Sequence, residues 1–405
     1  MSNIPKLRFP EFTDAWEKCK LGSIAKRVKG NDGDMSLPTL TISAGSGWLS
    51  QKERFSGNIA GTEQKNYTLL KKGQLSYNHG NSKVAKYGAV FVLKTYEKAL
   101  VPRVYHSFEM NKNGCADFIE VLFATKLPDR ELVKKITSGA RTDGLLNISF
   151  EGFMDINIKI PTLPEQQKIG NLFKQLDRLI TLHKRKWDDV ILLKKALLQK
   201  MFPKNGSDFP EIRFPEFTDA WEKCKLGKIV KERNEQYPKS NEYPLMAFIS
   251  GQGIADKGER YNRDFLVSDE ESKKYKRTEL DDFIYSSNNL ETGSIGLNRY
   301  GKACISPVYS IFYIDKSNDP YFIGQRLIQK DFIYQMTRYR QGVVYGQWRI
   351  HEKDFLKLSI IRPALPEQQK IGNLFKQLDR LITLHKRQHE HYQLLKKALL
   401  QQMFV

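Results

Sequence analysis

Apolar and polar residues follow two different periods along this chain. Between residues 163 and 201 the apolar positions recur every three to four residues, which is typical of an amphipathic α-helix. At about 1.5 Å per residue, a helix from about 165 to 201 is roughly 55 Å long. The same pattern returns from residue 365 to the end of the chain. The sequence therefore predicts two long helices.

The start of the first helix carries two further signals. Thr162 and Glu165 match a T-x-x-E capping box, and Pro164 falls in the first turn, where its missing N–H removes no hydrogen bond. In the second copy Ala364 stands where the first has Thr162. The second helix therefore departs from the pattern at its cap.

The segments between the helices alternate with a period of two. "VPRVYHSFEM" from Val101 and "ISPVYSIFYI" from Ile305 both combine β-branched and aromatic residues, as strands do. Glycine-rich turns separate such short strands, and helical patterns are few. We expect two α+β domains of one fold, each with a twisted sheet.

Two segments of the chain occur twice. "LPEQQKIGNLFKQLDRLITLHKR" occupies residues 163–185 and 365–387, and "RFPEFTDAWEKCKLG" occupies residues 8–22 and 213–227. The sequence between the copies has diverged. The chain thus consists of two repeats, each with a variable domain and a constant helix. The predicted boundaries are 1–162 and 203–364 for the variable domains and 163–202 and 365–405 for the helices.

The apolar stripe of such a helix needs a partner surface. Two identical stripes in one chain can cover each other, and a helix of this length extends beyond a domain of about 140 residues. We predict an antiparallel coiled-coil pair in which a local two-fold axis relates the repeats. The alternative is that each helix packs on its own domain. The residues predicted to pair are Ile169, Leu172, Phe173, Leu176 and Ile180 in the first helix and Ile371, Leu374, Phe375, Leu378 and Ile382 in the second.

Composition adds a strong positive charge. The 405 residues carry a formal net charge of +20, which favours a polyanionic partner, and nucleic acid is favoured over membrane because no separate basic anchor helix is found. The four cysteines have no zinc-site spacing, so no metal site is predicted. No apolar run has the length of a membrane span, and the first residues lack a signal-peptide pattern. We expect a cytoplasmic protein.

In these features the chain resembles the specificity subunits of type I restriction-modification systems. In that family, two variable target recognition domains alternate with constant regions whose helices open with LPEQ. This chain has "IPTLPEQQKIG" from Ile160 and "IRPALPEQQKIG" from Ile361. The resemblance covers essentially the whole chain. It implies a non-catalytic subunit in which each variable domain reads one half of an asymmetric bipartite DNA sequence, with unread bases between the halves.

The resemblance also implies partners. These are double-stranded DNA, two modification (methyltransferase) subunits and, in the full complex, restriction subunits. S-adenosylmethionine, ATP and magnesium are expected on the partner subunits and no cofactor on this chain. Twin partners need twin docking surfaces, although the charges of the two helices can equally be a solvated face. The candidate docking residues are Lys174, Gln175, Arg178 and Lys184, and their twins Lys376, Gln377, Arg380 and Lys386.

The first candidate region for DNA binding runs from Gln64 to His106. It holds eight Lys or Arg residues and a single acid, Glu97. Cations neutralise phosphates, and Tyr, Asn, His and Arg side chains beside glycines can approach base edges. An ordinary solvated loop is the alternative for each residue. The residues predicted to bind DNA in the first domain are Lys72, Tyr77, Asn78, His79, Asn81, Lys83, Lys86, Arg103 and Arg141.

In the second domain, "YSSNNLETG" from Tyr285 and "RYRQGVVYGQWRI" from Arg338 occupy the corresponding places. The second stretch and "GARTDGLLNISFEGF" from Gly139 both lie just upstream of LPEQ, so we expect this loop to face DNA in both domains. The residues predicted to bind DNA in the second domain are Asn288, Asn289, Arg338, Arg340, Gln347 and Arg349.

Two other functions remain as alternatives. "NDPYF" from Asn318 is close to the (D/N/S)-P-P-(Y/F/W) motif of amino-methyltransferases, but it lacks the second proline, and neither G-x-G-x-x-G nor a P-loop occurs. No catalytic residue is therefore predicted. The other alternative is a nucleic-acid-binding or protein scaffold without sequence specificity, which would bind all DNA sequences alike.

Overall fold

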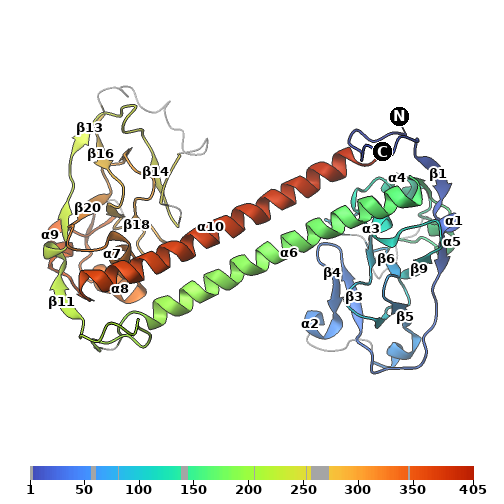
Figure 1. Cartoon of the computed structure of the whole chain (residues 1–405), viewed down its shortest axis with the longest axis horizontal. Coiled ribbons are helices and arrows are strands. Elements are labelled where there is room, and N and C mark those ends of the chain that lie inside the picture. Colours follow the sequence, from blue (N-terminus) through green and yellow to red (C-terminus); the bar gives the residue numbers. More distant parts are fainter. Residues whose placement is uncertain are drawn as a thin grey trace. The chain divides into compact units, whose positions relative to one another are not determined.

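Figure 1 shows the computed structural model of the chain. The chain divides into two compact units, which we call unit 1 (residues 1–184 and 386–405) and unit 2 (residues 185–385). Both long helices are thus divided between the units, whereas the boundaries predicted from the repeat keep each helix whole. The structure describes residues 3–55, 61–80, 82–137, 145–204, 206–251, 253–256, 273–344 and 347–405.

Unit 1 is built around a four-stranded antiparallel sheet. Its strands are, in spatial order, β2 (Ala25–Arg27), β9 (His106–Met110), β6 (Leu75–Asn78) and β7 (Ala89–Val92). Three antiparallel pairs join β1 (Glu17–Lys20) to β10 (Asn157–Ile160), β3 (Leu40–Ser43) to β4 (Gly47–Ser50), and β5 (Thr68–Lys71) to β8 (Lys98–Val101). The short helices are α1 (Leu21–Ile24), α2 (Gln51–Phe55), η1 (Gly61–Asn66), α3 (Ala116–Ala124), α4 (Asp129–Val133) and α5 (Phe150–Met154).

Unit 2 repeats this sheet order. Its four-stranded sheet contains β12 (Val230–Glu232), β20 (Ser310–Ile314), β17 (Phe283–Tyr285) and β18 (Ile295–Leu297). A three-stranded sheet contains β13 (Gln236–Tyr237), β16 (Tyr275–Thr278) and β19 (Ala303–Ile305). Three pairs join β11 (Glu222–Lys225) to β23 (Ser359–Arg362), β14 (Ala247–Ile249) to β15 (Gly253–Ala255), and β21 (Gln341–Val344) to β22 (Gln347–Arg349). The helices are η2 (Leu226–Lys228), α7 (Pro320–Leu327), α8 (Lys330–Thr337) and α9 (Glu352–Lys357).

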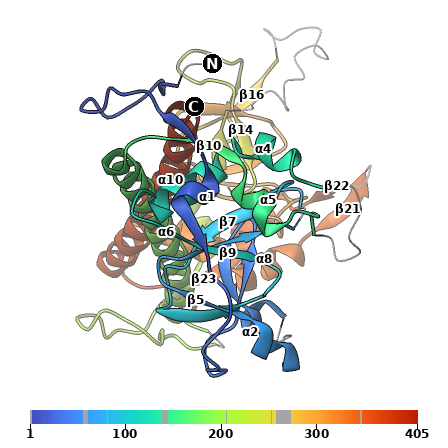
Figure 2. The ribbon, with the colours of Figure 1, turned by 90° about the vertical axis from the view of Figure 1, so that its right-hand side faces the viewer.

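The equivalent sheet order confirms that both variable domains are α+β domains of one fold. The two stretches predicted as strands become β8 with β9 and β19 with β20. Each unit buries its sheet against helices, and Figure 2, which views unit 1 end on, shows α6 and α10 to one side of β7 and β9. The two long helices, α6 (Leu163–Lys200) and α10 (Leu365–Gln402), have equal lengths of 38 residues. Their predicted existence and extent are confirmed.

The helices run antiparallel within each unit. In unit 1, the start of α6 lies beside the end of α10: the rings of Phe173 and Phe404 are 6.0 Å apart, and Lys396 donates to Asp177 at 2.5 Å. In unit 2, the end of α6 lies beside the start of α10, where Lys194 donates to Asp379 at 2.6 Å. The predicted antiparallel pairing is therefore confirmed.

The two identical stripes, however, do not cover each other. Ile169, Phe173 and Leu176 belong to the core of unit 1, together with its sheet and with Met403 and Phe404. The matching stripe of α10 belongs to the core of unit 2, together with Met201 and Phe202. Each stripe thus packs on its own domain and on the Met-Phe end of the other helix. The alternative of packing on the own domain is in part correct, because a domain core buries more apolar surface than a second helix alone.

The predicted capping box is wrong for Glu165. This side chain is fully buried, and its carboxylate accepts hydrogen bonds from Arg8 rather than from the backbone at the helix start. The second helix begins at the equivalent residue with Ala364 in place of Thr162, so the cap does not decide where these helices start.

Candidate nucleic-acid interface

A basic hollow lies in unit 1 near the start of β5. Its volume is about 450 Å³, and it is lined by segments that are far apart in the sequence. The last residue of β2 is Arg27, and Lys29 follows it shortly after in the chain. The end of η1 contributes Lys65, and the loop between β8 and β9 contributes Arg103. These four cations face the hollow, and among the described residues no acidic side chain lines it. Such a lining is suited to a phosphate group.

Three of these four cations are not paired with an acidic side chain of the described residues. Arg27 is held by Glu151, with Nη1 at 3.2 Å from Oε1. Lys29, Lys65 and Arg103 are exposed, and none of them has an ion-pair partner in the described part of the chain. The sequence prediction named Arg103 but missed Arg27 and Lys29, although the run "AKRVKG" from Ala25 was an available signal.

Two residues predicted to bind DNA lie in the core of unit 1. Tyr77 is fully buried, its ring stacks on Phe153 with centroids 4.4 Å apart, and its hydroxyl donates to a main-chain carbonyl. His79 is 3% exposed, and each ring nitrogen lies 2.8 Å from a main-chain carbonyl oxygen, one of them that of Leu146. Both belong to or directly follow β6, an inner strand of the sheet. Their assignment as DNA contacts is therefore corrected.

His79 and its neighbour His106 instead connect the sheet to the segment before α5. Their rings stack with centroids 4.8 Å apart, and Nε2 of His106 lies 3.0 Å from the carbonyl oxygen of Ile148. Burial lowers the pKa of His106 to about 4, so this ring is neutral at neutral pH.

The remaining predictions for the first domain divide by exposure. Lys72, Lys83, Lys86 and Arg103 are exposed, and Lys72 pairs with Glu97 at 2.5 Å. Asn78 is half-buried, and its amide donates to a main-chain carbonyl at 3.2 Å. Asn81 and Arg141 lie outside the described residues.

A second hollow, of about 580 Å³, lies in unit 2 between the loop that joins β19 to β20 and the hairpin β21–β22. Its lining combines cations, an acid, an amide and an indole, in Lys276, Asn288, Trp348, Arg349 and Glu352. Trp348 is 45% exposed, and the Arg349 side chain is 67% exposed. Lys276 is buried and donates to the main-chain carbonyl of Tyr309 at 3.0 Å. Asn288 and Arg349 can bond to base edges and Trp348 can stack on a base, so the lining is suited to base edges rather than to phosphate alone.

Asn288 is the most distinctive group of this hollow. It follows β17 and is half-buried, and its Oδ1 is enclosed without a hydrogen-bond partner among the described residues. An enclosed amide oxygen without a partner is costly, so this side chain has hydrogen-bonding capacity left for a ligand.

Of the other predicted residues of the second domain, some are held by hydrogen bonds within the fold and others are exposed. Arg340 donates two hydrogen bonds to Glu291, both of 2.7 Å, and a third to the carbonyl of Ser287 at 3.2 Å, so it is held by the fold. Asn289 and Arg338 are exposed, and Arg338 lies over the ring of Tyr334. For Gln347 the structure describes only the main chain, in β22.

The two hollows border equivalent strand ends. Thr68 pairs with Val101, and Lys276 pairs with Ile305, at the matching ends of β8 and β19. Two residues further along, Arg103 lines the hollow of unit 1 and Pro307 lines that of unit 2. The same region of one fold therefore presents different chemistry in the two domains.

Within the described residues, no group of three His, Cys, Asp or Glu side chains is arranged to hold a metal ion. None of the helices in the described residues is both long and apolar enough to cross a membrane.

The model of the family described as "Type I restriction modification DNA specificity domain" matches residues 14–192 and again residues 218–391. The chain belongs to this family. It is 24% identical over 300 residues to the "Putative type I restriction enzyme MjaX specificity subunit" of Methanocaldococcus jannaschii, covering 72% of this chain and 68% of the relative. It is 23% identical over 315 residues to the "Type I restriction enzyme MjaVIII specificity subunit" of the same organism, covering 71% and 70%.

The fold of this specificity-domain protein is similar to that of a solved one. The crystal structure of the type I restriction-modification system S subunit from M. genitalium superposes with a TM-score of 0.60 at 14% identity, over 99% of each chain. That likeness concerns the fold alone and agrees with the two-repeat architecture described above.

The two specificity-domain helices also expose the predicted docking residues. All eight side chains are exposed, and Lys174 lies 3.6 Å from Asp117. Several leucines of the helices are exposed as well: Leu192 and Leu394 occupy matching positions and are 66% and 68% exposed. These two leucines are thus open to solvent at equivalent positions of the two repeats.

Proposed function

We propose that this chain is the DNA-specificity subunit of a type I restriction-modification complex and that each of its two variable domains reads one half of an asymmetric bipartite DNA target. The observation that carries the proposal is the pair of hollows, which border equivalent strand ends of one fold and carry different residues. Two domains of one fold with different contact residues recognise different sequences.

The two hollows bind different parts of the DNA. The basic hollow of unit 1, with Lys29, Lys65 and Arg103, binds backbone phosphates, which gives affinity and a strong dependence on salt. In unit 2, Asn288 and Arg349 contact base edges, since an amide pairs with adenine and a guanidinium pairs with guanine. Arg141 remains proposed as a base-reading residue of the first domain.

The helices bind the partner subunits. Their identical exposed residues, including Lys174 and Lys376, suit two copies of one modification subunit, and the matching leucines Leu192 and Leu394 add apolar area. In this proposal the chain itself is not catalytic. Partner subunits supply the methyl transfer with S-adenosylmethionine, and restriction subunits supply the ATP-dependent and magnesium-dependent steps in the cytoplasm.

The proposal is tested by expressing the chain with its modification subunit and mapping methylated bases across a host genome by single-molecule sequencing. We expect one split motif with two unlike short elements and a fixed gap. Exchange of the first variable domain should change one element and leave the other intact. Binding that depends on salt but not on DNA sequence would instead indicate a scaffold.

A further inference from the structure

A joint of five residues connects each variable domain to its long helix. In unit 1 it consists of Arg8, Trp16, Glu165, Gln166 and Gly170, which we call joint 1. Arg8 and Trp16 come from the constant leading segment, and the other three come from the first two turns of α6. The variable domain meets both at the start of α3.

The first contact of joint 1 is a buried ion pair. Arg8 donates from Nε and from Nη2 to the two carboxylate oxygens of Glu165, both at 2.7 Å. The indole of Trp16 lies 3.4 Å from one of these oxygens. Glu165 is fully buried, and the side chain of Arg8 is 10% exposed. A bidentate pair of this kind fixes direction as well as distance, so the leading segment has one orientation on the helix.

The second contact reaches the variable domain, and it does so through main-chain atoms. Gln166 accepts from the backbone N–H of Cys115 at 3.0 Å and donates to the backbone carbonyl of Asn113 at 3.2 Å. Its amide also donates to the carbonyl of Pro161 at 2.9 Å. None of these partner atoms depends on which side chain the variable domain carries there.

The third contact is a close approach at Gly170. A Cβ atom added at this glycine would lie 3.0 Å from Cβ of Asp117 and 3.1 Å from the backbone nitrogen of Phe118. Both distances are tighter than ordinary packing. Only a glycine lets the first turn of α3 lie this close to α6 without displacement.

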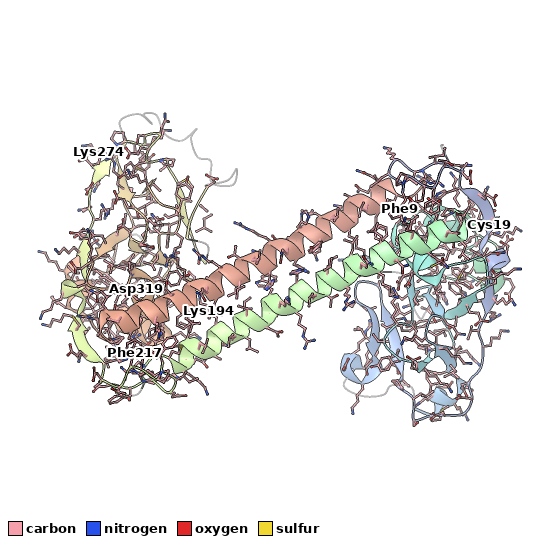
Figure 3. The ribbon with its side chains drawn as sticks, in the orientation of Figure 1. Phe9, Cys19, Lys194, Phe217, Lys274 and Asp319 are labelled. Carbon is pink, nitrogen blue, oxygen red and sulfur yellow. The ribbon has the colours of Figure 1, made fainter. Side chains whose placement is uncertain are left out.

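Unit 2 repeats the joint with Arg213, Trp221, Glu367, Gln368 and Gly372, which we call joint 2. Its ion-pair distances are 2.8 and 2.7 Å, and the indole distance is again 3.4 Å. Gln368 accepts from the backbone N–H of Asp319 at 3.1 Å, at the residue before α7, and its amide donates to the carbonyl of Pro363 at 2.8 Å. The same amide lies 3.5 Å from the side-chain Oδ1 of Asn318. Figure 3 labels Asp319, which lies next to the first turns of α10. A Cβ atom added at Gly372 would clash with the side-chain carboxylate of Asp319.

We infer that Gln166 and Gln368 are positioning residues for DNA recognition: by binding main-chain groups of the variable domain, each holds that domain at one fixed angle on the helices of its own unit. The inference rests on the proposed function and extends it. Both glutamines accept their hydrogen bond from a backbone N–H group of the variable domain. The residues of a domain that contact DNA can therefore change while the attachment of the domain to its helix stays the same. A change in this attachment should therefore alter which gap between half-sites is bound best and leave the bases read by the domain unchanged.

The physical reason lies in how two linked domains bind one DNA. The second half-site is bound at an effective concentration that depends on how narrowly its domain is oriented. A rigid joint keeps the domain in a narrow range of orientations, which favours binding to DNA with one gap length. A loosened joint allows a wider range of orientations, so that neighbouring gap lengths are bound as well, without changing the groups that contact bases.

The test uses the full chain in complex with its modification subunit and three sets of DNA duplexes. One set has the target found by methylation mapping, one has its gap changed by a single base pair in either direction, and one has a base replaced in the first element. The variant is Gln166→Ala, and the matched control is Gln167→Ala, which changes the exposed glutamine that directly follows it in the same helix. Dissociation constants are measured for all duplexes.

For Gln166→Ala we expect the preference for the native gap to fall about tenfold, as the loss of buried hydrogen bonds allows, while the preference for the native base is unchanged. Gln167→Ala should keep both preferences. Gly170→Ala, which presses on α3 without removing a polar group, should weaken the gap preference as well and provides a second variant if Gln166→Ala folds poorly.

An equal loss of affinity for every duplex, with the gap preference kept in both joint variants, would overturn the inference and leave the proposed function standing. Loss of the base preference together with the gap preference would also overturn it, because the joint would then shape the contact surface itself. Wild-type binding that ignores DNA sequence would overturn the proposed function, and this inference with it.

Discussion

Units 1 and 2 are nearly identical where the domain meets the helix and different where the domain meets solvent. The ion pairs of joints 1 and 2 agree to 0.1 Å (2.7 and 2.7 Å against 2.8 and 2.7 Å). At the matching ends of β8 and β19, by contrast, one domain has Arg103 and the other Pro307. One fold is thus used twice, with a fixed mounting and a variable surface.

The difference follows from what each region must satisfy. A joint buries charges and amides, so each polar atom needs its own partner, and a single substitution leaves one unpaired. The lining of an open hollow is solvated and tolerates many side chains. The joint is therefore constrained by folding, while the hollow is free to change with the ligand.

The largest effect is expected at the Met-Phe ends of the helices. Phe404 seals the core of unit 1 against Trp16, with centroids 5.7 Å apart, and Phe202 occupies the matching place in unit 2. Phe404→Ala and Phe202→Ala should each lower the free energy of unfolding of their own unit by about 3–5 kcal/mol. Denaturant unfolding measures this. Leu394→Ala, at a leucine that is 68% exposed on the same helix, should have little effect.

The next effect concerns the buried ion pair of joint 1. Glu165→Gln removes the charge that Arg8 needs, and the loss of one partner of a buried pair costs about 3 kcal/mol or more. The hydrogen bonds that Arg8 donates to Glu165 raise the pKa of Arg8. Arginine stays charged at neutral pH without them, so its guanidinium becomes uncompensated in the variant. Unfolding of the variant is compared with that of Glu97→Gln, which breaks an exposed pair with Lys72. The exposed pair should contribute less than about 1 kcal/mol, and equal losses would contradict the difference in burial.

A third prediction separates the two hollows. Arg349→Ala should reduce binding only for targets with the native second element, by about 1–3 kcal/mol, because it removes a contact to a base. Lys29→Ala should weaken binding to all sequences alike and lower the salt dependence by about one phosphate contact. Competition binding with cognate and altered duplexes at several salt concentrations distinguishes them. A uniform loss for Arg349→Ala would remove its role in base reading.

The smallest effect is a difference in pH response between the units. Burial lowers the pKa of His106 to about 4, so folded unit 1 binds fewer protons than the unfolded chain between about pH 6.5 and pH 4. Its stability should therefore fall as the pH is lowered through this window, by about 1–2 kcal/mol at pH 5. Unit 2 carries Ser310 at the matching strand position and lacks this contribution.

The measurement is unfolding at pH 7 and pH 5 for the wild type and for His106→Ser. The variant should lose less stability between the two pH values than the wild type, whatever its stability at pH 7. The same loss in both proteins would show that other groups cause the acid response.

Several features of this protein were determined by the sequence alone. The period of the apolar residues predicted both helices, and the observed bounds, Leu163–Lys200 and Leu365–Gln402, lie close to those expected. Alternation predicted β9 and β20, and the internal repeat predicted two domains of one fold. These features depend on residues that are near each other in the chain, where periodicity reports directly on the face that is buried.

Other features were decided only by the tertiary structure. Glu165 matched a capping box, but its partner Arg8 lies 157 residues away. Tyr77 and His79 looked like loop residues beside a glycine and are buried by an inner strand. The basic hollow joins Lys29, Lys65 and Arg103 from three separate segments. Local sequence does not report such contacts, because packing between distant segments decides which polar group is enclosed, which is paired and which is left for a ligand.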